Sequence, residues 1–280
     1  MLLFSLTTLL LLLVVVAVVT GSIELWRYLT TLGDEEFYLV FAVLAFYLAP
    51  DPLQGFSVVL AVVLSGELNV VLKYSINAPR PENPLVEVEG PGFPSGHAQV
   101  SSSFWSAVAL TWRKWSTCAL SVLVVVSVSL SRLYLRAHFV SDVLGGVLLG
   151  VLVTALTRLF LLRILRFPES LRLCSLGALS LVLGALAFYM GAELGAVSAL
   201  AGLSGVFVVA PVTYKLLKPL SSTRTSLRLL GFTASTAVLV SAHYVSSAEP
   251  AVVRTVLFFA CSVVSLLLIP VLVSRISSRG

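Results

Sequence analysis

Charged residues are scarce in this sequence. Only 11% of the 280 residues are Asp, Glu, Lys or Arg and 58% are apolar, whereas soluble domains have about 25% charged and about 45–50% apolar residues. A chain of this composition cannot cover a folded globule with polar side chains, and its mean hydropathy of +1.04 agrees. The composition therefore excludes a water-soluble domain and large soluble appendages.

Cysteine and histidine are also rare, with three residues of each. Cys118, Cys174 and Cys261 fall singly inside apolar runs, with no CxxC spacing and no histidine nearby. We interpret them as small packed residues that say nothing about redox compartment. The sequence has neither an HExxH motif nor a carboxylate cluster suited to two metal ions, so no metal and no other cofactor is expected.

Long apolar runs make up most of the chain. At about 20 residues per membrane span, ten runs are candidate transmembrane helices: Leu2–Val19, Phe37–Ala49, Leu53–Leu72, Ala98–Trp112, Ser116–Leu135, Phe139–Leu162, Leu173–Met190, Leu194–Val212, Leu229–Val245 and Ala251–Val273. The first run is longer than the apolar part of a signal peptide and lacks a basic start, so we expect a retained helix. Phe37–Ala49 is short, and we expect it to extend back through Gly33. The sequence thus predicts an all-α, polytopic membrane helical bundle.

The distribution of charge tests this topology. If ten helices alternate in direction, the loops on the side of the amino terminus carry 12 basic and 2 acidic residues, and the opposite loops carry 6 basic and 10 acidic residues. The positive-inside rule then places both termini in the cytoplasm. Trp112 and Trp115, which flank Arg113 and Lys114, are expected to anchor one membrane interface. The six cations on the outer side need a separate explanation.

Three of these cations fall in two polar loops on the outer side. The first loop carries Lys73, then Arg80-Pro81 six residues later, and then Pro94-Ser95-Gly96-His97 directly before the next helix. Ser95 is expected to cap that helix, whose free N–H groups and dipole favour an anion. The second loop reads Ser131-Arg132, His138 and Asp142, with five and three residues between them. On a helix, His138 and Asp142 would share a face, so that the carboxylate holds one imidazole nitrogen and leaves the other free to react.

These three motifs resemble those of the type-2 phosphatidic acid phosphatase superfamily, the membrane relatives of the vanadium haloperoxidases, without a departure. The resemblance covers about Gly33 to Leu162, together with Leu2–Val19. It implies a six-helix phosphatase core in residues 1–165, followed by about four additional transmembrane helices of unknown role in residues 166–280. It also implies the roles of the site residues. His138 would be the nucleophile, Asp142 its orienting partner and His97 the general acid, while the phosphate would be held by Lys73, Arg80, Ser95, Gly96 and Arg132.

The chemistry of these residues is consistent with this resemblance. A phosphomonoester carries almost two negative charges near neutral pH, and fixed cations with helix N–H groups can stabilise its oxygens during transfer. The expected reaction is metal-independent hydrolysis of a lipid phosphate or diphosphate through a phosphohistidine, at the non-cytoplasmic face. An isoprenoid carrier diphosphate or a phospholipid monophosphate is the expected substrate, because Glu82–Phe93 offers little material for recognising a large headgroup.

Other interpretations stay open. The same site could transfer phosphate to a lipid acceptor or hydrolyse a soluble sugar phosphate, and a transporter of anions or lipids could use the basic pocket for binding alone. The expected partners are the bilayer and its lipid, not nucleic acid, and the oligomeric state is unassigned. Glu67 lies inside an apolar run, where it is either functional or packed against a neighbouring helix that Gly66 allows to approach closely.

Overall fold

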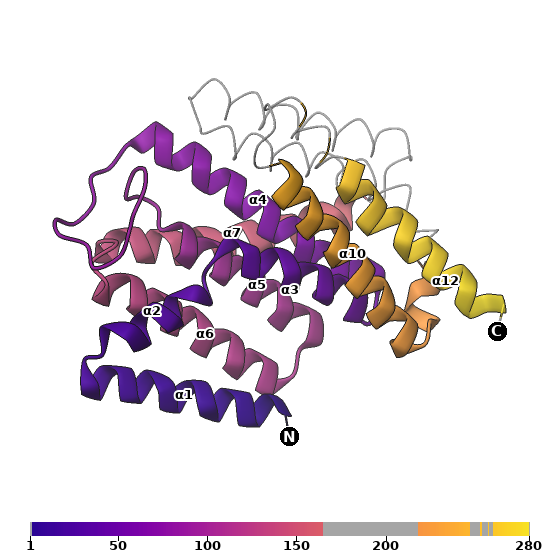
Figure 1. Ribbon diagram of the computed structural model, residues 1–280, viewed down its shortest axis with the longest axis horizontal. Coiled ribbons are helices and arrows are strands. Elements are labelled where there is room, and N and C mark those ends of the chain that lie inside the picture. The colour runs from indigo at the N-terminus through magenta and orange to yellow at the C-terminus, as the bar shows by residue number, and fades with distance from the viewer. Residues whose placement is uncertain (1, 165–217, 247–252, 254–256, 258–259, 280) are drawn as a thin grey trace. The chain divides into compact units, whose positions relative to one another are not determined.

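The computed structural model describes residues 2–164, 218–246, 253, 257 and 260–279. Within these ranges the ordered elements are helical and no strand occurs (Figure 1). In chain order the elements are α1 (Leu2–Thr20), α2 (Ile23–Thr31), α3 (Glu35–Leu48), α4 (Pro52–Ile76), α5 (Gly96–Trp112), α6 (Trp115–Tyr134), α7 (Val140–Ile164), the 3₁₀-helix η1 (Lys218–Ser222), α10 (Thr225–Ser246), the π-helical segment η2 (Val264–Leu268) and α12 (Ile269–Arg279).

The predicted fold class is confirmed. Among the described residues, 6 helical stretches are long and apolar enough to cross a bilayer: Leu3–Thr20, Pro52–Ile76, Trp115–Tyr134, Val140–Arg163, Thr225–Ala242 and Ala260–Ser277. The chain is therefore a multi-pass membrane protein built from helices. The predicted spans Leu173–Met190 and Leu194–Val212, and with them Cys174, lie outside the described residues.

Near the amino terminus one prediction is wrong and one helix was not predicted. The sequence did not predict α2, and α3 does not extend back through Gly33 because it begins at Glu35. The N–H of Gly33 donates to the carbonyl of Thr30 (2.8 Å) and that of Asp34 to Thr31 (3.1 Å), so the chain turns between the two helices. Ser22 is the N-cap residue of α2, and its side chain accepts a hydrogen bond from the N–H of Leu25. Serine is one of the residues preferred at this position.

The chain divides into two compact units. Unit 1 comprises Met1–Leu39 and Leu64–Leu156, and unit 2 comprises Val40–Val63 and Thr157–Gly280. All the site residues that the motifs predict belong to unit 1. The predicted domain boundary at residue 165 stays a prediction, because residues 165–217 lie outside the described part of the chain.

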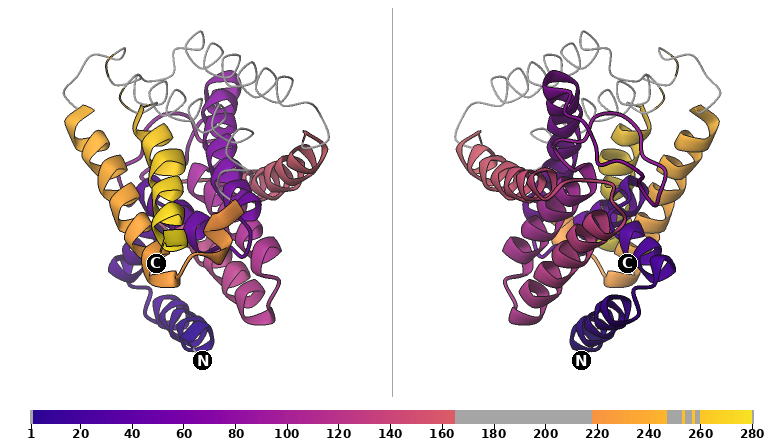
Figure 2. Two further views of the ribbon diagram at one scale, coloured as in Figure 1. Left: turned by 90° about the vertical axis from the view of Figure 1, so that its right-hand side faces the viewer. Right: turned by 90° about the vertical axis from the view of Figure 1, so that its left-hand side faces the viewer.

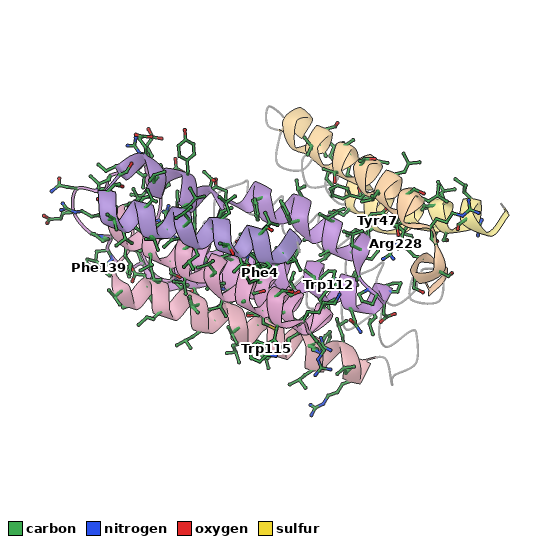
Figure 3. All side chains as sticks on the ribbon, turned by 90° about the horizontal axis from the view of Figure 1, so that it is seen from below. Phe4, Tyr47, Trp112, Trp115, Phe139 and Arg228 are labelled. Carbon is green, nitrogen blue, oxygen red and sulfur yellow. The ribbon has the colours of Figure 1, made fainter. Side chains whose placement is uncertain are left out.

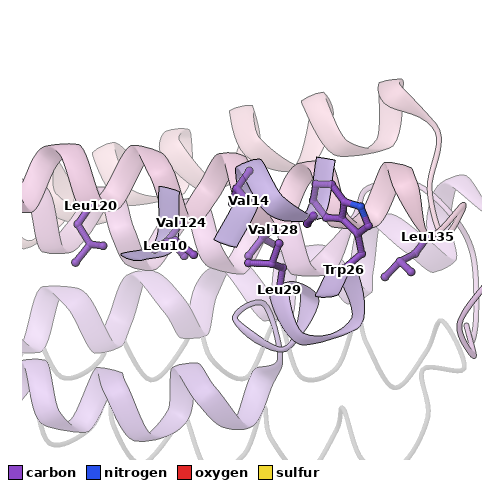
Figure 4. Packing of buried hydrophobic residues seen from close by; sticks show 9 residues of the cluster. Leu10, Val14, Trp26, Leu29, Leu120, Val124, Val128 and Leu135 are labelled. Carbon is purple, nitrogen blue, oxygen red and sulfur yellow. The ribbon is translucent and has the colours of Figure 1, made fainter. Parts of the chain in front are cut away.

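Helix α6 is the centre of packing in unit 1, where it contacts α1, α2 and α5. Leu120, Val124 and Val128 recur every four residues and form one apolar face of α6. This face packs against residues of α1 and α2 that include Leu10 and Trp26 (Figure 4). The ring of Trp26 also stacks on Tyr134, with ring centroids 5.1 Å apart. Burial of such side chains stabilises by about 1.5–3 kcal/mol each, and it holds the α2–α3 turn next to the last turns of α6.

Helix α7 lies very close to the start of α5. A Cβ atom added at Gly146 would lie 2.6 Å from the carbonyl oxygen of Ser95, closer than van der Waals contact allows. Further along the same helix pair, the hydroxyl of Thr154 donates to the carbonyl of Ser103 (2.9 Å). The two motifs that precede these helices are thereby brought together.

Unit 2 contains a buried polar cluster. The hydroxyls of Tyr47 and Ser235 lie 2.8 Å apart, and Ser235 also donates to the carbonyl of Ser265 (2.8 Å). Arg228 donates to the carbonyls of Tyr47 and Ala49, which are left free at the end of α3 (Figure 3). Helices α10 and α12 run side by side (Figure 2).

Candidate active site

Lys73 is placed by the last turn of α4. The helix ends at Ile76 because Asn77 adopts a positive φ of 48° and the prolines that follow cannot continue it. The ammonium of Lys73 donates to the carbonyl of Pro91 at 2.8 Å. Lys73 therefore lies against the far end of the same loop that carries Arg80.

Arg80 contacts the predicted nucleophile. Its Nη1 donates to the carbonyl of Ala137 (2.9 Å) and lies 3.2 Å from Nε2 of His138. Its Nε donates to the carbonyl of Gly90 (2.8 Å), and its Nη2 donates to the carbonyl of Glu89. Because a guanidinium has only donors, Nε2 of His138 must be the acceptor, and the ring proton is assigned to Nδ1. The lone pair of His138 thus faces the cation.

Asp142 lies on the other side of the His138 ring. Its Oδ2 is 3.6 Å from Nδ1 of His138, beyond a hydrogen bond, and it accepts a hydrogen bond from the N–H of Phe139 (2.9 Å). The two residues do not share a helix, because α7 begins at Val140 and His138 precedes it, so the spacing of four does not by itself bring them together. The capping contact of Asp142 with Phe139 brings its carboxylate back towards the loop. Both side chains are buried.

Burial and positive charge keep His138 neutral. Removal from water, followed by the charges of Arg80, Arg132 and Lys73, lowers the pKa of His138 to about 2. A charge on His97 also lowers the pKa of His138, so the two histidines lie within electrostatic range of each other. Burial lowers the pKa of Arg80 as well, against the charge of Asp142, which raises it. The result is an uncharged imidazole surrounded by cations.

Ser95 occupies the N-cap position of α5 with φ −66° and ψ 115°, but its side chain makes no capping hydrogen bond. The prediction is therefore correct for the position and wrong for the contact. The Ser95 N–H donates instead to the carbonyl of Asp142 (3.0 Å), which joins the second and third motifs. Its hydroxyl is buried and has no hydrogen-bond partner among the described residues, so it can donate to an anion.

A pair of buried amides supports this loop from behind. Asn69 Nδ2 donates to the carbonyl of Pro94 (3.2 Å) and to Oε1 of Gln99 (2.9 Å), and Gln99 Nε2 donates to the carbonyl of Ser65 (2.9 Å). A Cβ atom at Gly96 would lie 3.1 Å from Oδ1 of Asn69. The motifs did not predict Gln99, although a glutamine inside an apolar helix could have indicated a buried polar partner.

Glu67 is buried two residues before Asn69 on α4, and its Oε2 has no hydrogen-bond partner among the described residues. Its two interpretations, functional and structural, both stay predictions. The close approach expected at Gly66 is wrong for the described part of the chain, because a Cβ atom there would meet nothing within 4 Å.

His97 and Arg132 both contact the α2–α3 turn. Nε2 of His97 lies 3.1 Å from Oδ1 of Asp34, and Nη1 of the buried Arg132 donates to the hydroxyl of Thr30 (3.0 Å). The sequence motifs did not predict either contact, because Asp34 had entered only as one of the outer acids. The turn is thus a fourth segment at the site, next to the three motifs.

This arrangement defines a class of site. A neutral imidazole, with a carboxylate 3.6 Å from one nitrogen and a guanidinium 3.2 Å from the other, lies among three positive side chains and a helix N-terminus in a membrane-spanning helical bundle. Such groups suit covalent transfer of an anionic phosphoryl group. In the described ranges no three His, Cys, Asp or Glu side chains cluster closely enough to hold a metal ion.

Comparison with known proteins identifies the family. Residues 54–166 match the family model of the PAP2 superfamily, and this segment of the chain belongs to that superfamily. The matched segment contains all three motifs.

Individual relatives match parts of the chain. Phosphatidylglycerophosphatase B of Bacillus subtilis is 37% identical over 112 residues, 36% of this chain and 55% of the relative. Glucose-6-phosphatase 3 of Mus musculus is 29% identical over 199 residues (60% and 56%), and the undecaprenyl-diphosphatase of Sulfolobus acidocaldarius is 35% identical over 103 residues (34% and 50%). The chain spans about half the length of these relatives. A crystal structure of a transmembrane PAP2-type phosphatidylglycerolphosphate phosphatase from Bacillus subtilis is 27% identical, with a TM-score of 0.46 over 59% of this chain and 98% of that one.

Proposed function

We propose that this protein is an integral membrane phosphatase that hydrolyses a lipid phosphate or diphosphate through a phosphohistidine, without a metal ion. One observation carries the proposal. His138 is buried and neutral, its Nε2 lone pair faces Arg80, and its Nδ1 faces Asp142. A binding site for an anion needs cations, but it does not need an imidazole in this tautomer.

In the first half of the reaction, the phosphate is held by Lys73, Arg80 and Arg132 together with the hydroxyl and N–H groups around Ser95. As Arg80 turns its Nη1 hydrogen from His138 to a phosphate oxygen, the Nε2 lone pair becomes available. Nε2 then bonds to the terminal phosphorus while its bond to the leaving oxygen breaks; this oxygen is the alcohol oxygen of a monophosphate or the bridging oxygen of a diphosphate. Asp142 stabilises the positive charge that develops on the ring.

His97 handles the proton in both halves. It donates a proton to the departing oxygen, so that a monophosphate releases an alcohol and a diphosphate releases a protonated lipid monophosphate. It then accepts a proton from the water that attacks the phosphohistidine, and the bond from phosphorus to Nε2 breaks to release phosphate. The three cations supply the charge stabilisation that a metal ion would otherwise provide.

A lipid substrate is favoured over a soluble one. The loop from Glu82 to Phe93 is fastened at several points, since Arg27 donates to the carbonyl of Leu85 (3.0 Å) and the N–H of Leu85 donates to the carbonyl of Leu135 (2.9 Å). A short, fastened loop leaves room for a small headgroup, meaning phosphate or diphosphate. Two of the relatives described above are named for lipid phosphates, which supports an isoprenoid carrier diphosphate or a phospholipid monophosphate as the substrate.

The test is release of phosphate from a panel of lipids by the purified protein. The panel contains undecaprenyl diphosphate, phosphatidic acid, phosphatidylglycerol phosphate and glucose 6-phosphate, with His138→Ala as the inactive control. We expect fast turnover of a lipid and a covalent phosphoenzyme that is labile to acid and stable to base. Faster turnover of glucose 6-phosphate would establish the sugar phosphatase, for which the match to glucose-6-phosphatase 3 is the specific support. Label transferred to a lipid would establish a phosphotransferase, and full function of His138→Ala would establish a transporter.

The proposal also places the site on the non-cytoplasmic face, with both termini in the cytoplasm. The charge distribution between alternate loops supports this orientation. A single cysteine introduced by Glu87→Cys in the loop of the site should react with a membrane-impermeant maleimide in intact cells. Reaction only after the cells are opened would reverse the orientation.

A further inference from the structure

The α2–α3 turn makes three separate contacts with site residues. Thr30 accepts a hydrogen bond from the buried Arg132 (3.0 Å). Oδ1 of Asp34 lies 3.1 Å from Nε2 of His97. Between these two residues, Gly33 packs directly against the His97 ring. No sequence motif contains these residues, so the contacts arise from the fold of unit 1.

Gly33 shows how closely the turn fits the histidine. A Cβ atom at this position would lie 2.9 Å from Cδ2 and 3.0 Å from Cβ of His97, and 2.8 Å from Cγ1 of Val128. Real Cβ atoms do not approach this closely, so only glycine allows the backbone to lie against the ring. The ring is thereby confined on one side while Asp34 holds its Nε2.

The turn itself is held in place by α6 and α3. The hydroxyl of Tyr38 donates to the carbonyl of Leu32 (2.6 Å), and Leu29 and Trp26 of α2 are buried against α6. The carboxylate of Asp34 is thus carried on a fastened backbone, although its side chain is 39% exposed. A rigid carrier is what a residue that orients another side chain requires.

The charges around His97 come from several elements. Asp34 contacts it directly, Arg132 of α6 and Lys73 of α4 bring positive charge to it, and it interacts electrostatically with His138. Burial, together with these cations, lowers the pKa of His97, whereas the carboxylate of Asp34 at hydrogen-bonding distance opposes that shift. Among these groups Asp34 alone acts in favour of the proton that a general acid must carry.

We propose that Asp34 is a positioning residue that orients His97 and favours its protonated form for its role as general acid, an inference that rests on the proposed function. In the doubly protonated ring, the hydrogen on Nε2 is held by Asp34 and the proton on Nδ1 is available. That proton passes to the leaving oxygen as the bond between oxygen and phosphorus breaks and the bond between phosphorus and Nε2 of His138 forms. Neutral His97 then accepts the proton of the attacking water, which restores the pair.

The experiment compares wild type with Asp34→Asn and Asp34→Ala on the best lipid of the panel and on p-nitrophenyl phosphate, as a function of pH. Asparagine retains a hydrogen-bond acceptor but loses the charge, and alanine loses both. We expect kcat/KM for the lipid to fall about tenfold or more, which is less than the loss expected when the general acid itself is removed. The alkaline limb of its pH profile should move about one unit lower. Hydrolysis of p-nitrophenyl phosphate should change little, because nitrophenolate leaves without a proton.

Glu24→Gln is the matched control. Glu24 is an exposed acid on α2 that pairs with Arg27 at 3.0 Å, so its substitution removes one carboxylate from the helix that precedes the turn without touching His97 or Arg132. Its pH profile should match that of wild type. In a His97→Ala background, Asp34→Asn should have no further effect on the lipid reaction, because the group that Asp34 positions is then missing.

The outcomes separate the two proposals. A wild-type protein that releases no phosphate from any member of the panel overturns the proposed function. If wild type is active and Asp34→Asn keeps the same alkaline limb and the same ratio of lipid to nitrophenyl rates, the role of Asp34 is wrong. An increase in activity for Asp34→Asn would also overturn it, because Asp34 would then restrain His97. Equal losses on both substrates with an unchanged pH profile would assign Asp34 to folding alone.

Discussion

Acidification should destabilise the folded protein through His138. The buried imidazole has a pKa of about 2 in the folded chain, against an ordinary value of 6.5. Below pH 6.5 the unfolded chain therefore binds a proton at this residue that the folded chain rejects. Because the unfolded state binds more protons, stability falls as the pH is lowered, from pH 6.5 down to about pH 2.

The magnitude follows from the size of the pKa difference. Each pH unit below 6.5 costs about 1.4 kcal/mol for one such group, so the change from pH 6.5 to 5.0 costs about 2 kcal/mol. His138→Gln is the matched variant. Its amide oxygen can accept the hydrogen bond from Arg80 and its amide N–H can face Asp142, but it does not titrate.

The assay is reversible denaturant unfolding in detergent micelles at a series of pH values. The free energy of unfolding of wild type should decrease between pH 6.5 and 5.0 by about 2 kcal/mol more than that of His138→Gln. Equal slopes for the two proteins would refute the neutral, buried state of His138. The neutral nucleophile in the proposed reaction would then have no support.

Three further predictions concern the site and its support. Arg80→Lys keeps the charge but loses the planar fork, and kcat/KM should fall at least about 100-fold; a rate near that of wild type would contradict the contact with His138. Gly146→Ala should lower the free energy of unfolding by about 1–3 kcal/mol, because the added Cβ meets the carbonyl of Ser95. Gly66→Ala is the control, because its added Cβ meets no described atom, and it should leave the free energy of unfolding unchanged or raise it slightly. Turnover should persist in EDTA and be inhibited by vanadate, which mimics five-coordinate phosphorus; loss of activity in EDTA with recovery on adding magnesium would refute the metal-independent reaction.

The helical spans could be read from the sequence because the bilayer leaves few alternatives. A long apolar run must satisfy its own backbone hydrogen bonds in lipid, and a helix does so locally. Helix α2 escaped this reasoning, since it is nine residues long and carries Glu24 and Arg27 on an exposed face. It forms because Trp26 and Leu29 pack against α6, a contact that no local pattern contains.

For the site as well, some features were predicted from the sequence and others came only from the structure. The motifs predicted Lys73, Arg80 and His138 as members of one site because phosphate chemistry requires cations and a nucleophile in a recognisable spacing. Their contacts with one another came only from the structure: Arg80 holds the lone pair of His138, and Ser95 bonds to the Asp142 backbone where a side-chain cap was expected.

The sequence by itself determined that this chain crosses a membrane with helices and that two of its loops carry cations and histidines suited to phosphate. These conclusions depend on composition and on residues close together in the chain. Only the tertiary structure brought Asp34 to His97 and Gln99 to Asn69, residues 63 and 30 positions apart. Hydrogen-bond partners at such separations depend on how helices pack, and packing is a property of the whole fold.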